Sequence, residues 1–120
     1  MSIYLKSFFH QLGEITSELV DMFPDDADFK VFQTYVNMLK TTNPGLVIDS
    51  YYDIVIKFDD QINARNDDFF LNYNTSEYGQ EGVDIVAKIK LYWSVLSEDS
   101  KKSIWDYIYI LKELAKKYKA

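Results

Sequence analysis

Hydrophobic residues recur at spacings of three and four along most of the chain, which is the period of an amphipathic helix. Successive hydrophobic seams extend from Leu5 to Met22, from Phe29 to Leu39, from Ile48 to Ile62, from Ile85 to Leu96 and from Ile104 to Tyr118. No run of alternating polar and apolar residues is long enough to indicate a strand. The pattern therefore predicts an all-α fold.

The seams are separated by residues that are typical of helix ends. Pro24 breaks the first helix, and Asp25 or Asp26 can cap the second. The pair Asn43–Pro44 fits the cap and the first position of a third helix. Ser97 is placed to cap the last helix, with acidic residues in its first turn. These signals predict a compact bundle of about five helices in a single domain, residues 1–120.

The second seam is wider than the others. Val31, Tyr35 and Met38 extend it to about half of the helix circumference. Because a helix with so broad an apolar surface needs partners on several sides, we expect this helix to be central in the bundle.

Residues 66–82 interrupt the helical pattern with asparagine, aspartate, serine and glycine, and are predicted to form one long loop. Loops of this length are often functional. This one also holds Phe69, Phe70 and Tyr73, which a fully solvated loop would not need. Either these aromatic residues fold back to plug one end of the bundle, or they form a partner-binding loop.

Composition and charge narrow the function classes. Apolar residues make up 48% of the 120 residues, which is enough to build a core. The chain has no cysteine, no apolar run of the roughly 20 residues that span a bilayer and no signal-peptide pattern. We therefore expect a cytoplasmic protein that does not enter a membrane.

The net charge of −6 is unevenly distributed along the chain. Residues 1–84 hold five Lys/Arg and fifteen Asp/Glu, whereas residues 85–120 hold eight and four. An acidic body and a basic end complement each other, so head-to-tail self-association is a natural expectation.

The last predicted helix holds the clearest candidate site. Trp105, Tyr109, Lys112 and Lys116 follow the spacing i, i+4, i+7, i+11 and lie towards the side opposite the hydrophobic seam, together with Lys101. Aromatic residues interleaved with lysines can grip an acidic protein surface, or stack on bases beside phosphates. The alternative is that Trp105 packs beneath the first helix as part of the core.

Metal and catalytic sites have weaker signals. His10 and Glu14 stand at i and i+4, but a zinc site needs three or four ligands. A cluster of oxygen-bearing side chains follows the third seam, and either caps and turns or a divalent-metal site would explain it: Asp59, Asp60, Asn63, Asn66, Asp67 and Asp68. The chain shows no calcium-loop pattern, glycine-rich phosphate loop or nucleophile elbow. We expect no enzymatic activity, no cofactor and no metal; a metal-dependent hydrolase at this cluster is the remaining catalytic alternative.

The end of the chain carries a motif that resembles a known group of proteins. It reads Trp93-x-x-Leu96-Ser97-Glu98, then Lys101-x-x-Ile104-Trp105-x-Tyr107, then Leu111-x-x-Leu114, preceded by the turn Phe23-Pro24-Asp25-Asp26, the break at Asn43-Pro44 and the pair Phe69-Phe70. The chain thereby resembles small uncharacterised helical proteins encoded by giant and other nucleocytoplasmic large DNA viruses. The resemblance implies a viral origin and brings no catalytic or binding residues with it.

Together these observations predict a non-catalytic protein–protein interaction or scaffolding module, as a viral structural or virus–host interaction protein in the host cytoplasm or the virion. Its partner would be another protein or a second copy, with no small-molecule substrate evident. The expected binding residues are Trp105, Tyr109, Lys101, Lys112, Lys116, Phe69, Phe70 and Tyr73. The alternative is an accessory nucleic-acid-binding protein that uses the stripe on the last helix.

Overall fold

The computed structural model describes residues 2–72 and 85–120, and the regular elements in these ranges are all helices. Their order is α1 (Ile3–Met22), α2 (Ala27–Thr42), α3 (Pro44–Val55), the 3-10 turn η1 (Ile56–Phe58), α4 (Asp59–Asn63), α5 (Asp67–Asn72), α6 (Ile85–Tyr92), the 3-10 turn η2 (Trp93–Val95) and α7 (Glu98–Lys119). The predicted all-α bundle is confirmed.

Side-chain caps begin the helices where the sequence predicts them. The Asp26 carboxylate accepts a hydrogen bond from the Asp28 amide at 3.0 Å, and the Ser97 hydroxyl accepts one from the Ser100 amide at 3.1 Å. The Asn43 side chain accepts one from the Leu46 amide at 3.4 Å, directly before Pro44 begins α3. These caps satisfy amide groups that the first helical turn leaves without a partner.

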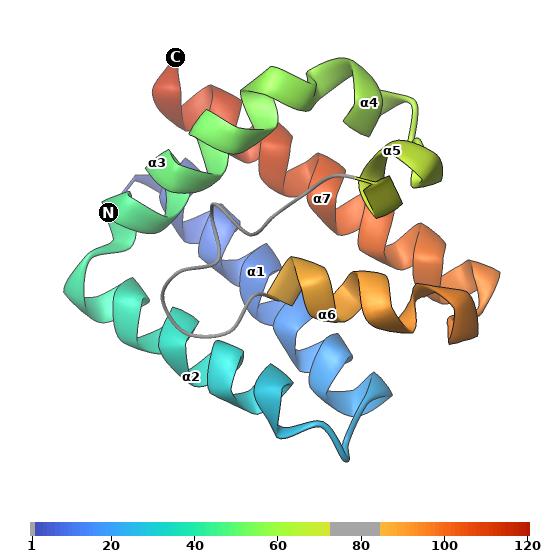
Figure 1. Cartoon of the computed structure of the whole chain (residues 1–120). Helices are drawn as coiled ribbons and strands as arrows, with labels where there is room; N and C mark the ends of the chain where they lie inside the picture. Colours follow the sequence, from blue (N-terminus) through green and yellow to red (C-terminus); the bar gives the residue numbers. More distant parts are fainter. Residues whose placement is uncertain (1, 73–84) are drawn as a thin grey trace.

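The two longest helices, α1 and α7, cross the middle of the molecule side by side (Figure 1). They are antiparallel, because the start of α1 packs with the end of α7 in one core cluster, while Glu18 near the end of α1 accepts hydrogen bonds from Ser103 and Tyr107. Helix α2 packs beside α1, α3 packs against both helices of the pair and against α2, and α6 runs in front of the pair in Figure 1.

The core consists of two clusters of buried residues. One gathers Ile15, Leu19, Phe29, Val55, Ile62, Ile89, Trp93, Ile104 and Trp105. The other gathers Leu5, Phe8, Phe9, Val36, Ile48, Leu111 and Ala115. Leu12 and Tyr51 pack against both clusters, so the two are joined through α1 and α3.

The expectation that the second helix is central is wrong. Only Phe29 and Val36 of α2 are buried, whereas Val31 and Met38 are 49% and 51% exposed. The central position belongs to α1 and α7, so α2 is covered on one side only. Its broad apolar seam is therefore wider than the surface that its neighbours bury.

The third seam and the predicted loop also differ from expectation. The seam does not form one helix but bends through η1 into α4, and Asp67–Asn72 form the helix α5 where a loop was predicted. Arg65 makes the turn between them with a φ of 51°, in the left-handed region. The Asn66 side chain then accepts a hydrogen bond from the Phe69 amide at 3.0 Å, which caps α5. Residues 73–82 of the predicted loop lie outside the described residues.

Among the helices that the structure describes, none has the length and apolar character that a membrane crossing requires.

The Ser97 cap predicts a measurable contribution to stability. Replacing Ser97→Ala leaves the Ser100 amide without its acceptor, and we expect the free energy of unfolding to fall by about 1 kcal/mol. Urea unfolding followed by circular dichroism measures this. The matched control is Ser94→Ala, an exposed serine of η2; equal losses in the two variants would contradict the capping role.

Candidate functional site

The predicted stripe on the last helix is not one exposed surface. Trp105 is only 6% exposed, which supports the interpretation of this residue as part of the core. Lys112 is only 1% exposed, so the expectation that it faces solvent is wrong. Lys101 is half-buried, while Tyr109 and Lys116 are about two-fifths exposed. Only Tyr109 and Lys116 of this set therefore present much surface to a partner.

Trp105 is a core residue with a polar tether. Its indole Nε1 donates a hydrogen bond to the Asp67 carboxylate at 2.7 Å, and its ring meets Phe70 edge-on with centroids 5.9 Å apart. Phe70 also packs on Trp93, with centroids 5.1 Å apart. The helical wheel of α7 places Trp105 opposite the seam, but α5, which the sequence did not predict, covers that side.

Of the three aromatic residues predicted in the loop, Phe69 and Phe70 belong to the described residues. Phe70 packs into the core, and Phe69 packs on Phe58 with ring centroids 5.2 Å apart. For these two residues the structure supports the interpretation that they fold back against the bundle. Tyr73 lies outside the described residues.

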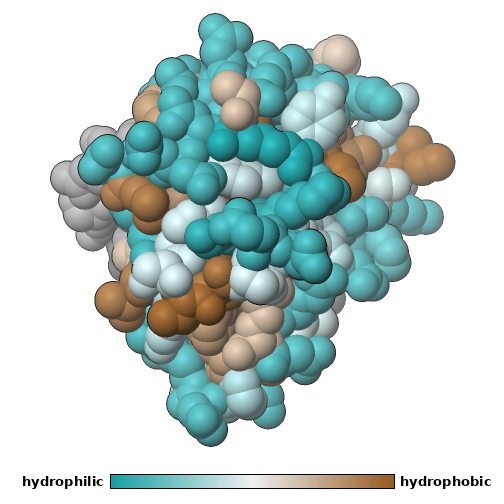
Figure 2. Space-filling model, turned by 90° about the vertical axis from the view of Figure 1, so that its right-hand side faces the viewer, coloured by the Kyte–Doolittle hydropathy of each residue, from teal (hydrophilic) through white to brown (hydrophobic). Residues whose placement is uncertain are grey.

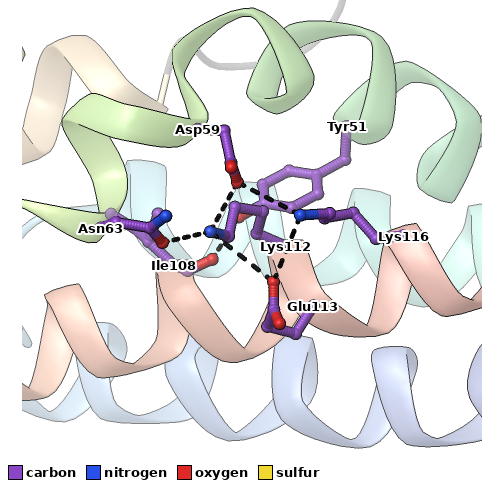
Figure 3. Close-up of polar contacts among 7 residues, drawn as sticks. All are labelled: Tyr51, Asp59, Asn63, Ile108, Lys112, Glu113 and Lys116. Atoms are coloured by element: carbon purple, nitrogen blue, oxygen red, sulfur yellow. Dashed lines mark hydrogen bonds and ion pairs between the residues drawn. The ribbon is translucent and has the colours of Figure 1, made fainter.

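Lys112 lies at the centre of a buried polar cluster (Figure 3). Its ammonium is 2.7 Å from a carboxylate oxygen of Asp59, donates to the amide oxygen of Asn63 and lies 3.6 Å from Glu113. It also lies over the Tyr109 ring, 4.8 Å from the centroid. A buried ammonium is tolerated only where such partners replace its hydration.

Lys116 joins the same cluster from the next turn of α7 (Figure 3). Its ammonium is 3.6 Å from Asp59 and 3.9 Å from Glu113. The adjacent ammonium of Lys112 holds the pKa of the Asp59 carboxyl below its ordinary value, against the opposing effect of burial. Asp59 and Asn63 therefore bind lysines of the predicted basic stripe. Asn66 caps α5, and Asp67 and Asp68 form its first turn, which supports the cap-and-turn interpretation of these acids.

Other basic residues of α7 are paired within the chain as well. Lys119 lies 3.1 Å from Asp49 of α3, and Lys102 lies 3.0 Å from Asp106 of its own helix. Arg65 also pairs with Asp106, and this contact helps to fix the turn before α5 to α7. The pairs Lys119–Asp49 and Arg65–Asp106 thus join the acidic body to the basic end within one molecule, while head-to-tail pairing stays a prediction.

A second polar network joins α2 to α6, and the sequence analysis did not find it. Asp26 accepts a hydrogen bond from the Tyr92 hydroxyl at 2.6 Å and one from the Lys88 ammonium at 3.0 Å. Lys88 is also 3.0 Å from Asp28. The hydrogen bond from Tyr92 is the main cause of a lowered pKa at Asp26. The partners are more than 60 residues apart, so no local pattern could reveal them.

A surface depression of about 450 Å³ adjoins this network and is lined by Met22, Phe23, Pro24, Asp25, Asp26, Ala27 and Tyr92. One wall is aromatic, since Phe23 stacks on Tyr92 with centroids 4.4 Å apart and on Phe29 with centroids 5.1 Å apart. Asp25 is exposed at its edge. The depression is therefore both aromatic and acidic.

The described residues include no group of three or more histidine, cysteine, aspartate or glutamate residues placed to hold a metal ion. The predicted pair His10 and Glu14 does form, with the imidazole Nε2 at 3.9 Å from the carboxylate. Both side chains are more than half exposed, so this pair is a surface contact of small energetic weight.

Several large hydrophobic side chains are exposed. The most exposed are Val95, Ile3 and Leu91, at 74%, 72% and 68%. Figure 2 faces the end of the molecule where α6 and η2 meet the start of α7, and small hydrophobic groups there are bordered by hydrophilic residues. Leu91 and Val95 stand at i and i+4, on adjoining turns of α6 and η2.

Comparison with known proteins gives no family: no protein-family model matches the chain, and neither a curated protein nor a solved structure is significantly similar to it.

The buried cluster around Lys112 predicts a large effect on stability. Lys112→Met leaves the Asp59 carboxylate, which is 30% exposed, with Lys116 alone of its two lysine partners, and we expect the free energy of unfolding to fall by about 1.5 to 3 kcal/mol. The control is Lys117→Met on the exposed side of α7, with an expected change within about 0.5 kcal/mol. A double-mutant cycle with Asp59→Leu should recover part of the loss; additive losses would contradict the coupling.

The raised pKa values of two tyrosines lead us to expect a lower free energy of unfolding at alkaline pH. Burial, followed by the hydrogen bond to Glu18, raises the pKa of Tyr107 to about 12, and burial raises the pKa of Tyr51 further. Their stabilising effect is complete below the unfolded-state pKa of about 10 and is lost as the pH rises through the folded-state values. Urea unfolding across this window measures the loss.

The control for the alkaline prediction is Tyr107→Phe, which cannot ionise. Its stability should fall less steeply than that of the unaltered protein between pH 10 and pH 12. Identical slopes for the two proteins would show that Tyr107 does not contribute.

Proposed function

We propose that this protein is a non-catalytic protein–protein interaction or scaffolding module. The observation that carries the proposal is the exposure of Leu91 and Val95, at 68% and 74%, on adjoining turns of one helical segment. Burial of either side chain would contribute roughly 1.5 to 3 kcal/mol. Two apolar side chains that this fold leaves exposed so close together in the chain suit a surface that a partner covers.

The polar residues support the same proposal indirectly. The buried Lys112 contacts the partly exposed Asp59, which also contacts Lys116, and Asp26 binds Lys88 and Tyr92. These side chains hold helices together through contacts with one another. Their roles are those of a stable scaffold.

The predicted nucleic-acid alternative has lost its main geometric support. Trp105 and Lys112 are buried and cannot stack on a base or bind a phosphate from the surface. Lys116 and Lys119 are paired with carboxylates of the same chain. A weak electrostatic contact with nucleic acid would use other lysines and would be sensitive to salt.

A role as a viral structural or virus–host interaction protein, in the host cytoplasm or the virion, belongs to the same proposal. It rests on the motif around Trp93 and Trp105 and on the resemblance described from the sequence.

An affinity pull-down tests the proposed function. The tagged full chain is incubated with extract of its native cell at low and moderate salt, and bound material is analysed by mass spectrometry and by ultraviolet absorbance. We expect one protein, at a fixed stoichiometry, to remain at moderate salt, because an apolar contact is insensitive to screening. A second copy of the chain would appear as a doubled mass in light scattering.

Two results would contradict the proposal. Bound nucleic acid that washes off with salt would favour the nucleic-acid alternative. An empty bead at both salt concentrations, with the protein folded by circular dichroism, would remove the support for an interaction module.

A further inference from the structure

We propose that α6 is a conformational latch, a helix that opens as a unit while the rest of the core stays folded. The Asp26 carboxylate, at the start of α2, keeps this latch closed. The latch is a property of the chain alone, so it goes beyond the proposed function and does not depend on it.

Helix α6 is attached to the fold through few buried residues. Of its side chains that the structure describes, residues 86–92, Ile89 alone is buried, whereas α1 buries six residues and α7 five. Leu91 lies on the opposite side of the helix from Ile89 and is 68% exposed. The most extensive packing of α6 on another α-helix is with α2. Segments with few buried apolar contacts open locally at a lower free energy than the fold as a whole.

The anchors of α6 are three residues on one of its sides. Lys88 and Tyr92 stand at i and i+4, with Ile89 between them on the same face. The Tyr92 ring stacks on Phe23 with centroids 4.4 Å apart, and Ile89 belongs to the same core cluster as Phe29. Two of the three anchors also carry polar groups, and the partners of these groups lie at the start of α2.

One carboxylate, that of Asp26, joins these anchors to the rest of the fold. Its Oδ1 accepts a hydrogen bond from the Asp28 amide at 3.0 Å, which caps α2. Its Oδ2 accepts one from the Tyr92 hydroxyl at 2.6 Å and one from the Lys88 ammonium at 3.0 Å. The Lys88 ammonium is also 3.0 Å from the Asp28 carboxylate. Because a charged acceptor forms the stronger hydrogen bond, the negative charge of Asp26 stabilises the closed position of α6 through both anchors.

The latch ends where the chain enters η2. Trp93 is 4% exposed and packs on Phe70 of α5, with ring centroids 5.1 Å apart. The ammonium of Lys101 on α7 lies 5.8 Å from the centroid of the Trp93 ring. Trp93 is therefore held by α5 and α7, and it stays in place when α6 opens. Opening uncovers Phe23 and Phe29, whose rings stack on each other with centroids 5.1 Å apart.

Thiol labelling tests the latch. The chain has no cysteine, so Ile89→Cys and Ile104→Cys each introduce a single buried thiol, the first in α6 and the second in α7. We expect the Ile89→Cys thiol to react roughly tenfold faster than the Ile104→Cys thiol, with little dependence on urea below the unfolding transition. Equal rates, or the same urea dependence at both positions, would show that α6 opens only when the whole fold unfolds, and would overturn the proposal.

A variant in the other core cluster separates local opening from global unfolding. Leu5→Ala removes buried apolar contacts from the cluster that does not contain Ile89. It should accelerate labelling of the Ile104→Cys thiol, because it lowers the free energy of unfolding. It should leave labelling of the Ile89→Cys thiol unchanged, because that cluster is intact whether α6 is closed or open. Equal acceleration at both positions would contradict local opening.

Matched variants test the role of the Asp26 carboxylate. In the Ile89→Cys protein, Asp26→Asn removes the charge but keeps the cap of α2, since asparagine caps helices as well as aspartate does. We expect labelling to accelerate by about tenfold. The control is Asp25→Asn, which removes the same charge from the exposed neighbouring residue and should leave the rate unchanged. Circular dichroism establishes that each variant is folded; equal rates in the two variants would overturn the assignment of Asp26 as the residue that keeps α6 closed.

Discussion

The neutralisation of Lys112 inside the fold is the interaction on which the rest of the structure depends. Its side chain is 1% exposed, so its ammonium must find its partners within the chain. From α4, Asp59 supplies the opposite charge and Asn63 supplies a hydrogen-bond acceptor, so α4 must lie against α7 (Figure 3). The turn at Arg65 then carries α5 over Trp105, whose indole binds Asp67.

The pairing of charges within the chain also changes the functional interpretation of the uneven charge distribution. From the sequence, a basic end and an acidic body indicate electrostatic attraction between molecules. In the structure, some of these charges form ion pairs within the chain, such as Lys119 with Asp49 and Lys116 with Asp59. The proposed interaction rests instead on exposed apolar side chains, and Leu91 and Val95 are among the most exposed of these in the described residues.

The sequence predicts most of the fold because helix ends and seams are local properties. Asn43 and Ser97 cap the expected helices, since a cap needs only the three residues that follow it. The helix α5 was missed because aspartates and asparagines are typical of loops, although Asn66 followed by Asp67 and Asp68 also satisfies a cap with an acidic first turn.

The candidate site was harder to predict, because the solvent exposure of a side chain depends on segments that are distant in the sequence. The wheel of the last helix gives the direction of Trp105 relative to Ile104, but whether that direction faces water depends on α5. The width of the second hydrophobic seam does not reveal burial either, because Val31 and Met38 are apolar and yet exposed. The network of Asp26, Lys88 and Tyr92 joins two segments that are distant in the sequence, and neither segment carries a local pattern that indicates the contact.

The most direct test of internal neutralisation is the rate at which each lysine is acylated in the folded protein. An amine-reactive reagent is added in limiting amount, and the modified positions are quantified by mass spectrometry. We expect Lys112 to react far more slowly than the exposed Lys117 and Lys102, and to reach their rate only after unfolding. Reaction of Lys112 at the same rate as Lys117 in the folded protein would show that its ammonium is in water, and would contradict the account.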